Sequence, residues 1–382
     1  LMLVFLIFTS LLISTMPANA IENGESALNH PRILQHYLVE DAKTNSLRPN
    51  CSGWLYSPRI VFTAGHCVYN AQEKPSKILN NPLKIYVGKP GATRFFGPAE
   101  SQVRAAKVFA YDSFEWYQAT PGGTLSYKDD FAIIVLEKPL ANVSPAKIAT
   151  KEFLDNLTTK GEFIETGGYG FQDNSRQFNL GDEPKKAKFQ LISSDLGMKT
   201  VSEFKQKWNR TYFQEGAMFV KLPKNGAAPC DGDSGSGYFY NSNGEFTYLG
   251  TMMGLLGSPN CGIDTWTDSA VGPFRPIYLD VNLIKQAEQY VSDNPYIEKP
   301  PKKLLICTNG KKTKNIFGIN PKCPSGFRIV IPKEGQACMN FGELSRGLTC
   351  AEWNKKLIWL TYTLSEAING RPKIGSRCYR EG

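Results

Sequence analysis

The stretch PCDGDSGSGY, Pro229–Tyr238, places a serine within a run of very small residues. Ser234 is followed by Gly235, preceded two positions earlier by Gly232, and lies four residues after Cys230. Glycines suit a place where the backbone must approach another group closely. A hydroxyl that attacks an amide needs backbone N–H donors aimed at the developing oxyanion, and unobstructed glycines leave room for them. The stretch therefore indicates a catalytic site around Ser234 and not a filler loop.

Two other short stretches carry the groups that such a serine needs. FTAGHC, residues 62–67, contains His66, and imidazole titrates in the range of a general base. DDFAIIVL, residues 129–136, places Asp130 directly before an apolar run, and a carboxylate can fix the tautomer of the base. Each stretch alone is often structural. In the order His66, Asp130, Ser234, the three predict nucleophilic catalysis by a hydroxyl.

Residues 21 to about 293 resemble a chymotrypsin-type serine protease of the trypsin family, and these motifs are specific to it. The resemblance implies that His66 is the general base and acid, Asp130 its orienting partner and Ser234 the nucleophile. It also implies that the amides of Gly232 and Ser234 form the oxyanion hole. Asp129 is the alternative to Asp130, but the family's pattern of aspartate, apolar residue and alanine fits Asp130.

The family resemblance also predicts the fold. It implies an all-β chain of two antiparallel six-stranded β-barrels with a C-terminal helix, and a site in the cleft between the barrels. Between residues 21 and 280 the sequence favours the same class, because short apolar or alternating runs are bounded by Gly, Pro and Asn. Residues 281–291 have helical spacing and predict the closing helix, and a more helical insertion is expected over residues 200–213.

The first twenty residues, LMLVFLIFTSLLISTMPANA, are apolar and end in Ala18-Asn19-Ala20. This pattern is typical of a secretory signal peptide, with a membrane anchor as the alternative. Cleavage after Ala20 would expose Ile21, and the resemblance implies that the new ammonium pairs with Asp233 and orders the oxyanion loop. We therefore expect a secreted enzyme that is active on export, with no transmembrane anchor after cleavage.

The specificity pocket departs from the family pattern. Ala228 occupies the pocket-base position six residues before Ser234, so a preference for Lys or Arg at the cleaved bond is not expected. Gly257, with the two leucines before it, is expected to form one wall, and Arg275-Pro276 the opposite one. A small or medium apolar side chain is the predicted preference.

The nine cysteines of an exported chain are expected to form disulfides. The family resemblance implies the pairs Cys51–Cys67 and Cys230–Cys261. In the tail, spacing predicts the pairs Cys307–Cys323 and Cys338–Cys350, each closing a small β unit, and leaves Cys378 unassigned. We therefore predict three segments: a signal peptide over residues 1–20, a protease domain over 21–297, and a small disulfide-stapled β tail over 298–382.

The tail is strongly basic. Residues 298–382 contain 16 Lys and Arg, six Glu and no Asp, a net charge of +10, whereas the whole chain has +9. The tail resembles small basic modules appended to exported actinobacterial proteins. We expect it to bind an anionic polymer of the cell envelope, with a solvated spacer as the alternative. Nucleic acid is not an expected partner, because no recognisable reader motif accompanies the charge.

The sequence thus predicts a secreted serine endopeptidase acting on a protein or peptide substrate, with no cofactor and no metal. A non-catalytic binding protein of the cell envelope that keeps the protease fold is the alternative. An esterase-like hydrolase is a third possibility, but it would more usually carry a G-x-S-x-G elbow on an α/β scaffold.

Overall fold

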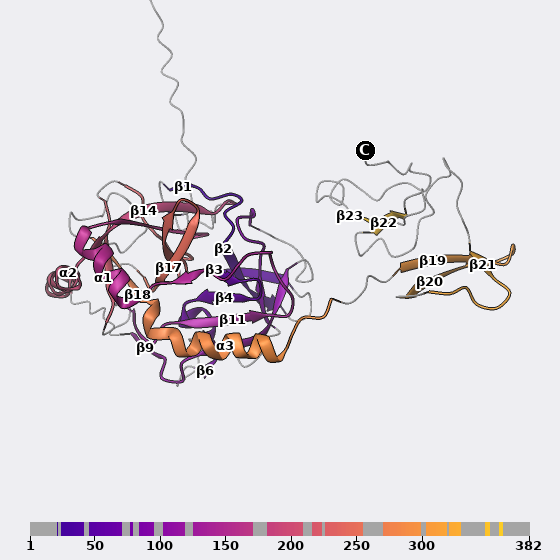
Figure 1. The fold of residues 1–382 in the computed structure, drawn as a ribbon, viewed down its shortest axis with the longest axis horizontal. Helices are drawn as coiled ribbons and strands as arrows, with labels where there is room; N and C mark the ends of the chain where they lie inside the picture. The colour runs from indigo at the N-terminus through magenta and orange to yellow at the C-terminus, as the bar shows by residue number, and fades with distance from the viewer. Residues whose placement is uncertain are drawn as a thin grey trace, which may run out of the picture. The chain divides into compact units, whose positions relative to one another are not determined.

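The computed structural model describes residues 21, 24–41, 46–70, 77–78, 84–94, 102–118, 125–170, 182–208, 216–223, 226–254, 270–298, 303–318, 321–329, 348–351 and 359–361. The chain divides into two units, residues 1–296 and 297–382. Unit 1 contains the three motifs of the predicted site, and unit 2 is the basic tail (Figure 1).

The first barrel of unit 1 closes in the order β11-β4-β3-β2-β7-β8. The apolar run that follows Asp130 forms β11, and all five of its residues are buried. Ile134 packs inside this barrel, whereas Ile133 packs in the larger core shared with the second barrel. A strand buried on both faces needs an unbroken apolar run, which is what the sequence provides. The six strands are β2 (Ile33–Asp41), β3 (Ser46–Ser57), β4 (Ile60–Thr63), β7 (Ile85–Val87), β8 (Val103–Ala110) and β11 (Ala132–Leu136).

The second barrel has the order β14-β13-β16-β17-β18-β15 and closes because β14 also pairs with β15. Two short strands, β1 (Glu25–Ser26) and β12 (Lys147–Ile148), add to β14 and β17. The two six-stranded antiparallel barrels confirm the predicted fold. The strands of the second barrel are β13 (Phe163–Gly168), β14 (Lys185–Ile192), β15 (Met218–Lys221), β16 (Gly237–Ser242), β17 (Glu245–Met252) and β18 (Val271–Pro276).

Aromatic side chains from both barrels meet in the shared core. Trp54 of β3 lies 4.4 Å from Phe239 of β16, measured between ring centroids, and Phe62 of β4 lies 5.1 Å from Tyr248 of β17. All four are fully buried. Large rings in contact contribute both buried area and preferred tilted geometry. This packing fixes the two barrels against each other, so groups from both can form one site.

In the part of the chain that the structure describes, three α-helices flank the barrels. The predicted closing helix is confirmed as α3 (Val281–Asp293), and it follows the 3-10 turn η5 (Ile277–Asp280). The insertion helix α2 spans Ser194–Trp208 and so begins before the expected start at residue 200. Helix α1 (Lys151–Lys160) was not predicted from the sequence. It begins where the hydroxyl of Thr150 accepts the N–H of Phe153 at 3.2 Å, an N-cap.

Unit 1 also contains short hairpins. The 3-10 turn η1 (Gly65–Cys67) contains the predicted base His66. It leads into β5 (Tyr69–Asn70), which pairs with β6 (Lys77–Ile78), and β9 (Glu115–Gln118) pairs with β10 (Leu125–Lys128).

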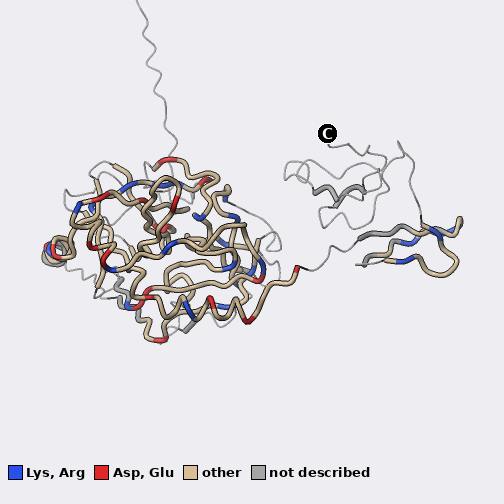
Figure 2. Tube along the Cα trace, viewed as in Figure 1, with Lys and Arg blue, Asp and Glu red and all other residues tan. Residues whose placement is uncertain are grey.

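Unit 2 contains a three-stranded sheet closed by the Cys307–Cys323 disulfide. Its hairpin turns at Asn309, whose side-chain oxygen accepts the N–H groups of Lys311 and Lys312. Figure 2 shows Lys and Arg but no Asp or Glu along the described part of this sheet. The strands are β19 (Lys303–Thr308), β20 (Thr313–Gly318) and β21 (Arg328–Ile329), and a separate pair is β22 (Leu348–Ala351) with β23 (Trp359–Thr361).

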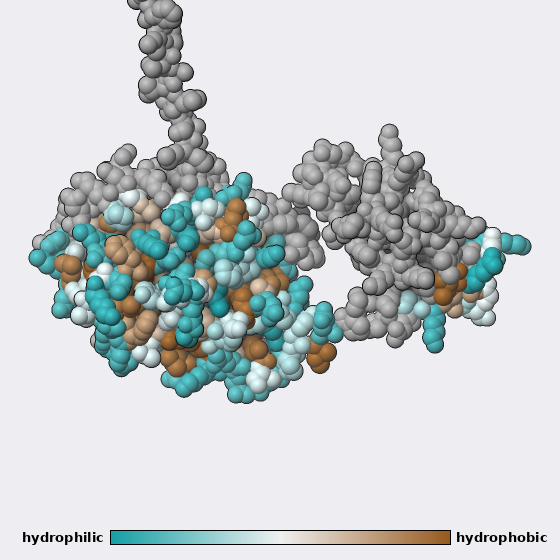
Figure 3. All heavy atoms as spheres, turned by 45° about the horizontal axis from the view of Figure 1, so that its top comes forward, coloured by the Kyte–Doolittle hydropathy of each residue, from teal (hydrophilic) through white to brown (hydrophobic). Residues whose placement is uncertain are grey.

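The predicted pair Cys338–Cys350 is not tested, since Cys338 and Cys378 lie outside the described residues. On the face of unit 1 in Figure 3, apolar side chains are interspersed with polar ones. Among the described residues, no helix combines the length and the apolar character needed to cross a membrane.

Candidate active site

His66 and Asp130 are in direct contact. The Nδ1 atom of His66 lies 2.9 Å from Oδ2 of Asp130 and 3.1 Å from Oδ1. The backbone N–H of His66 also donates to Oδ1 at 2.8 Å. Because a carboxylate only accepts, this geometry assigns the ring proton to Nδ1 and leaves Nε2 with a lone pair. Asp130 is fully buried, whereas the side chain of His66 is 19% exposed.

Asp129 makes its contacts with residues other than His66. It has a φ of 53°, which is unusual for a residue other than glycine. Its carboxylate accepts from the hydroxyl of Ser113 at 2.6 Å and from the guanidinium of Arg275 at 3.2 Å. Of the two adjacent aspartates, Asp130 is therefore the one in contact with His66.

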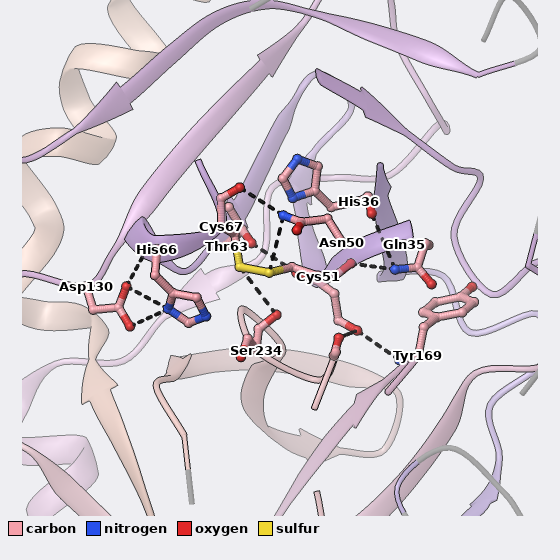
Figure 4. Close-up of a disulfide and its surroundings, with 12 residues drawn as sticks. Gln35, His36, Asn50, Cys51, Thr63, His66, Cys67, Asp130, Tyr169 and Ser234 are labelled. Carbon is pink, nitrogen blue, oxygen red and sulfur yellow. Dashed lines mark hydrogen bonds and ion pairs between the residues drawn. A yellow bond between two sulfur atoms is a disulfide. The ribbon is translucent and has the colours of Figure 1, made fainter. Parts of the chain in front are cut away.

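Ser234 lies against the disulfide next to His66. The disulfide joins Cys51 of β3 to Cys67 of η1, as the resemblance implied. The carbonyl oxygen of Ser234 is 3.8 Å from Sγ of Cys67 and accepts the N–H of Ser52 at 2.9 Å. Figure 4 shows Ser234, His66 and Asp130 around this disulfide. The fold thus brings the three sequence motifs to one place.

The loop that carries Ser234 depends on two glycines. Gly232 has a φ of 95° and Gly235 a φ of 82°, in the left-handed region that side chains disfavour. A Cβ on Gly235 would lie 2.2 Å from the hydroxyl of Thr63, so this glycine also allows a close approach to β4. The loop backbone is tied to the second barrel, since the N–H of Gly235 donates to Met252 O.

Asp233 is fully buried beside this loop and is surrounded by backbone donors. Its carboxylate accepts from Gly170 N at 2.8 Å and from Cys230 N at 2.9 Å, and the backbone of Ile21 also hydrogen-bonds to it. Burial raises its pKa from 3.8 to about 7, and the hydrogen bonds together with the charge of Arg94 oppose that rise. Ile21 is fully buried in the shared core. The structure thus places the two members of the predicted activation pair in contact.

The specificity pocket is only partly described. Ala228, the predicted pocket base, is buried. Gly257, Leu255 and Leu256 lie outside the described residues, and so does Cys261. Cys230 is disulfide-bonded, but its partner is not among the described residues.

The side chain of Arg275, near the predicted second wall, is buried in an ionic network. It contacts both oxygens of Asp280, at 2.9 and 3.0 Å, and lies over the ring of Tyr111. Burial raises the pKa of Asp280 to about 6, and the positive charge of Arg275 opposes the rise.

One cluster of potential metal ligands occurs among the described residues: His36, Cys51 and Cys67. Both sulfur atoms are joined to each other in the disulfide, so they are not thiolate ligands.

With this geometry, the relation to known proteins can be assessed. Residues 23–282 match the family described as Trypsin. The chain belongs to the trypsin family. Granzyme M of Rattus norvegicus is 26% identical over 215 residues, which cover 56% of this chain and 70% of the relative. Trypsin eta of Drosophila erecta is 20% identical over 275 residues, covering 72% and 90%, and Trypsin-1 of Astacus astacus is 23% identical over 237 residues, covering 61% and 83%.

Membership in the trypsin family indicates a serine protease, and hence a hydrolase with peptide substrates. The family match ends at residue 282, so the relation of the tail to other exported modules stays a prediction.

Two residues that contact the site were assigned no role from the sequence. Ser52 directly follows Cys51, but nothing in the sequence shows that its hydroxyl reaches Gly232. Arg94 is buried, and its guanidinium donates to the carbonyl of Tyr169, next to Gly170. The available signals were weak: a small polar residue beside a disulfide cysteine, and an arginine in a loop.

Proposed function

We propose that the chain is a secreted serine endopeptidase that hydrolyses peptide bonds through an acyl-enzyme intermediate. The observation that carries the proposal is the double contact of Asp130 with the backbone and ring of His66, in a site where Ser234 adjoins the neighbouring Cys67. In the proposed site, His66 supplies a base with a fixed tautomer, and the glycine-rich loop beside the disulfide supplies the hydroxyl of Ser234.

In the proposed mechanism, Ser234 Oγ attacks the carbonyl carbon of the scissile bond while His66 Nε2 accepts the hydroxyl proton. The resulting imidazolium is stabilised by the buried carboxylate of Asp130. The negative oxygen of the tetrahedral intermediate accepts hydrogen bonds from the N–H groups of Gly232 and Ser234. His66 then donates its proton to the leaving amine, and the acyl group remains on Ser234 until water, activated by the same imidazole, releases it.

The proposed activation step uses Ile21 and Asp233. Removal of residues 1–20 would turn the backbone N–H of Ile21 into an ammonium beside a buried carboxylate. That carboxylate already accepts from Gly170 and Cys230. A buried charge pair depends strongly on both partners, so the pair would hold the loop of Ser234 in place. N-terminal sequencing of the exported protein tests this step, and a start well downstream of Ile21 would contradict it.

The proposed specificity is for small or medium apolar side chains, with Ala228 at the pocket base and Gly257 in one wall. A buried Lys or Arg of the substrate would find no carboxylate at Ala228, which makes such substrates unfavourable. Profiling against a peptide library measures this preference directly. Efficient cleavage only after Lys or Arg would contradict it.

Covalent labelling is the decisive test of the enzymatic function. A fluorophosphonate probe should label the protein at Ser234 and should not label the Ser234→Ala variant, because only an activated serine reacts. The non-catalytic binding protein that is the alternative would remain unlabelled while keeping the fold. An unlabelled, folded wild-type protein with a free Ile21 would therefore overturn the peptidase proposal.

We further propose that unit 2 binds an anionic polymer of the cell envelope. Its described residues include six Lys and Arg and one acidic residue, Glu298, and Lys311 and Lys312 are exposed at the hairpin turn. The full chain should bind cell-wall preparations less as salt rises, because surface charges are screened. K311E/K312E should weaken retention, whereas K138E/K199E, at exposed positions in unit 1, should not. Equal retention of both variants would support the spacer alternative.

A further inference from the structure

Ser52 links the first barrel to the loop of Ser234 through two hydrogen bonds and to Tyr169 through a third. Its backbone N–H donates to the carbonyl of Ser234 at 2.9 Å. Its hydroxyl oxygen lies 2.9 Å from the carbonyl of Gly232 and 2.8 Å from the backbone N of Tyr169. Both residues whose amides are proposed for the oxyanion hole are therefore held, through their carbonyls, by this one residue of β3.

The orientation of the Ser52 hydroxyl is determined by its two partners. The N–H of Tyr169 can only donate, so the hydroxyl oxygen accepts from it and its own proton goes to Gly232 O. Ser52 is fully buried, so water does not compete for either bond. Space is tight as well: a Cβ on Gly168 would lie 2.8 Å from Ser52 Oγ. The hydroxyl is thus a fixed bridge between two backbone segments.

The segment Tyr169–Gly170 holds the loop at a second point. Its Gly170 N–H donates to the carboxylate of Asp233, while its Tyr169 N–H reaches Gly232 through Ser52. The peptide between Gly232 and Asp233 is therefore restrained at its carbonyl and at the following side chain. Such restraint matters because Gly232, at a φ of 95°, has no side chain that would limit its rotation. Figure 4 labels Tyr169, on the side of the site where this segment lies.

We propose that Ser52 is a positioning residue that preorganises the oxyanion hole, an inference that rests on the proposed peptidase function. Its hydroxyl fixes Gly232 and its backbone N–H fixes Ser234, so that both amides are aimed before substrate arrives. Preorganised donors stabilise the transition state without reorganisation at the moment of reaction. Ser52 itself does not contact the reacting atoms in this role.

The test compares Ser52→Ala and Ser52→Gly with the wild-type enzyme on a peptide substrate selected from the library. Both variants keep the backbone bond to Ser234 and lose the bridge to Gly232. We expect kcat to fall about tenfold, since removal of a complete oxyanion donor costs about 100- to 1000-fold and here a donor is only loosened. KM should stay within about twofold, because the loss is confined to the transition state.

The matched control is Thr166→Val. The hydroxyl of Thr166 is also fully buried and donates to a backbone carbonyl, that of Gly237, at 3.0 Å. Its loss should lower stability as a lost buried hydrogen bond does, yet leave kcat within about twofold. Amide hydrogen exchange provides the second readout. Exchange in residues 230–236 should be about tenfold faster in both Ser52 variants and unchanged in Thr166→Val.

The outcomes separate this inference from the proposed function. A lowered kcat with unchanged KM in the Ser52 variants, and not in Thr166→Val, supports the positioning role. Wild-type kcat in Ser52→Ala, or an equal loss in Thr166→Val, overturns it. If the wild-type protein neither cleaves nor reacts with the probe, the peptidase proposal fails. The exchange rates then decide whether Ser52 positions the loop, and unchanged exchange overturns that role as well.

Discussion

Two parts of the candidate site are held in place in different ways. The His66–Asp130 contact is made within the first barrel, between η1 and the start of β11, and the disulfide at Cys67 anchors the same turn. The loop from Cys230 to Ser236 belongs to the second barrel, but its anchors include the carbonyl contacts of Ser52 and the hydrogen bond from Ile21. The His66–Asp130 pair is held within one barrel, whereas the loop that carries Ser234 depends on distant segments of the chain.

This difference indicates where control is exerted. A base and its orienting acid that share one barrel are assembled as soon as that barrel folds. A loop whose buried carboxylate needs the backbone at Ile21 changes when the chain is cut there. Changes near the N-terminus should therefore alter the oxyanion loop and leave the His66–Asp130 contact as it is.

Substitution of Asp130, the orienting acid, should disrupt the His66–Asp130 pair. In Asp130→Asn the amide can donate to Nδ1 and so favours the wrong tautomer of His66, which is expected to lower kcat by about 10⁴-fold. The measurement is kcat on a selected peptide. Asp129→Asn is the matched control, because Asp129 contacts Ser113 and Arg275 instead. The loss of kcat in Asp129→Asn should stay below about tenfold. Equal losses of kcat in the two variants would contradict the assignment of Asp130 as the orienting acid.

Substitution of Asp233 should disrupt the loop that carries Ser234 and leave the His66–Asp130 pair intact. In the processed protein, Asp233→Asn would leave the Ile21 ammonium buried without its counter-charge, at a cost of about 3–5 kcal/mol. We expect kcat/KM to fall about 100-fold because part of that cost is relieved when the loop rearranges.

The diagnostic for Asp233→Asn is the low-field NMR signal of the His66 Nδ1 proton. It should persist in this variant, because its partner Asp130 is untouched. Disappearance of the signal would show that the two parts are not independent.

The Cys51–Cys67 disulfide contacts both the turn of His66 and the loop of Ser234, so its removal tests both parts of the site. Cys51→Ala/Cys67→Ala opens a loop with a sequence separation of 16, and the free energy of unfolding of unit 1 should fall by about 3 kcal/mol. The double variant also removes the sulfur beside the Ser234 carbonyl, so activity should decrease too.

The tail offers a control with the same loop length. Cys307–Cys323 also has a separation of 16, so Cys307→Ala/Cys323→Ala should destabilise unit 2 by a similar amount. Thermal unfolding and peptide hydrolysis measure both effects. A loss of peptidase activity on opening the tail disulfide would contradict the independence of the two units.

The family resemblance implied the two barrels and the site residues, and the sequence patterns themselves favoured the all-β class and the closing helix. An unbroken apolar run after Asp130 is what a strand buried on both faces requires, and β11 has this form. Glycines around Ser234 signal positive φ angles, which Gly232 and Gly235 adopt. The amphipathic spacing of residues 281–291 was strong enough to predict α3.

Other features could not be predicted because they depend on tertiary contacts. The hydroxyl of Ser52 acquires its role only when Gly232, 180 residues away, is placed beside it. Arg94 contacts Tyr169, the residue that follows β13 of the other barrel. Helix α1 was missed although Thr150 and Gly161 are ordinary start and stop residues, since its apolar stripe is short, with Leu154 and Leu157 buried and Phe153 partly buried.

The effect of pH on stability, which is smaller for each pH unit, should distinguish the two parts again. Burial lowers the pKa of His36, next to the Cys51–Cys67 disulfide, from 6.5 to about 3. Its neutral ring therefore contributes stability above pH 6.5 that is lost as pH falls toward 3, by about 1.4 kcal/mol for each pH unit. In the uncut chain, the contribution of Asp233 to stability changes with pH in the opposite direction. Its pKa is raised to about 7, so its contribution is present below about pH 4 and is lost as pH rises through 7.

Urea unfolding at a series of pH values measures both contributions. His36→Leu should lose less stability than the wild-type protein between pH 6.5 and 4. Asp233→Asn in the uncut chain should lose less between pH 4 and 7. Cutting before Ile21 should abolish the difference between Asp233→Asn and the wild-type protein, because the ammonium lowers the pKa of Asp233. It should leave the difference between His36→Leu and the wild-type protein unchanged. If cutting alters both, the two parts of the site share one electrostatic environment, and the division between them is wrong.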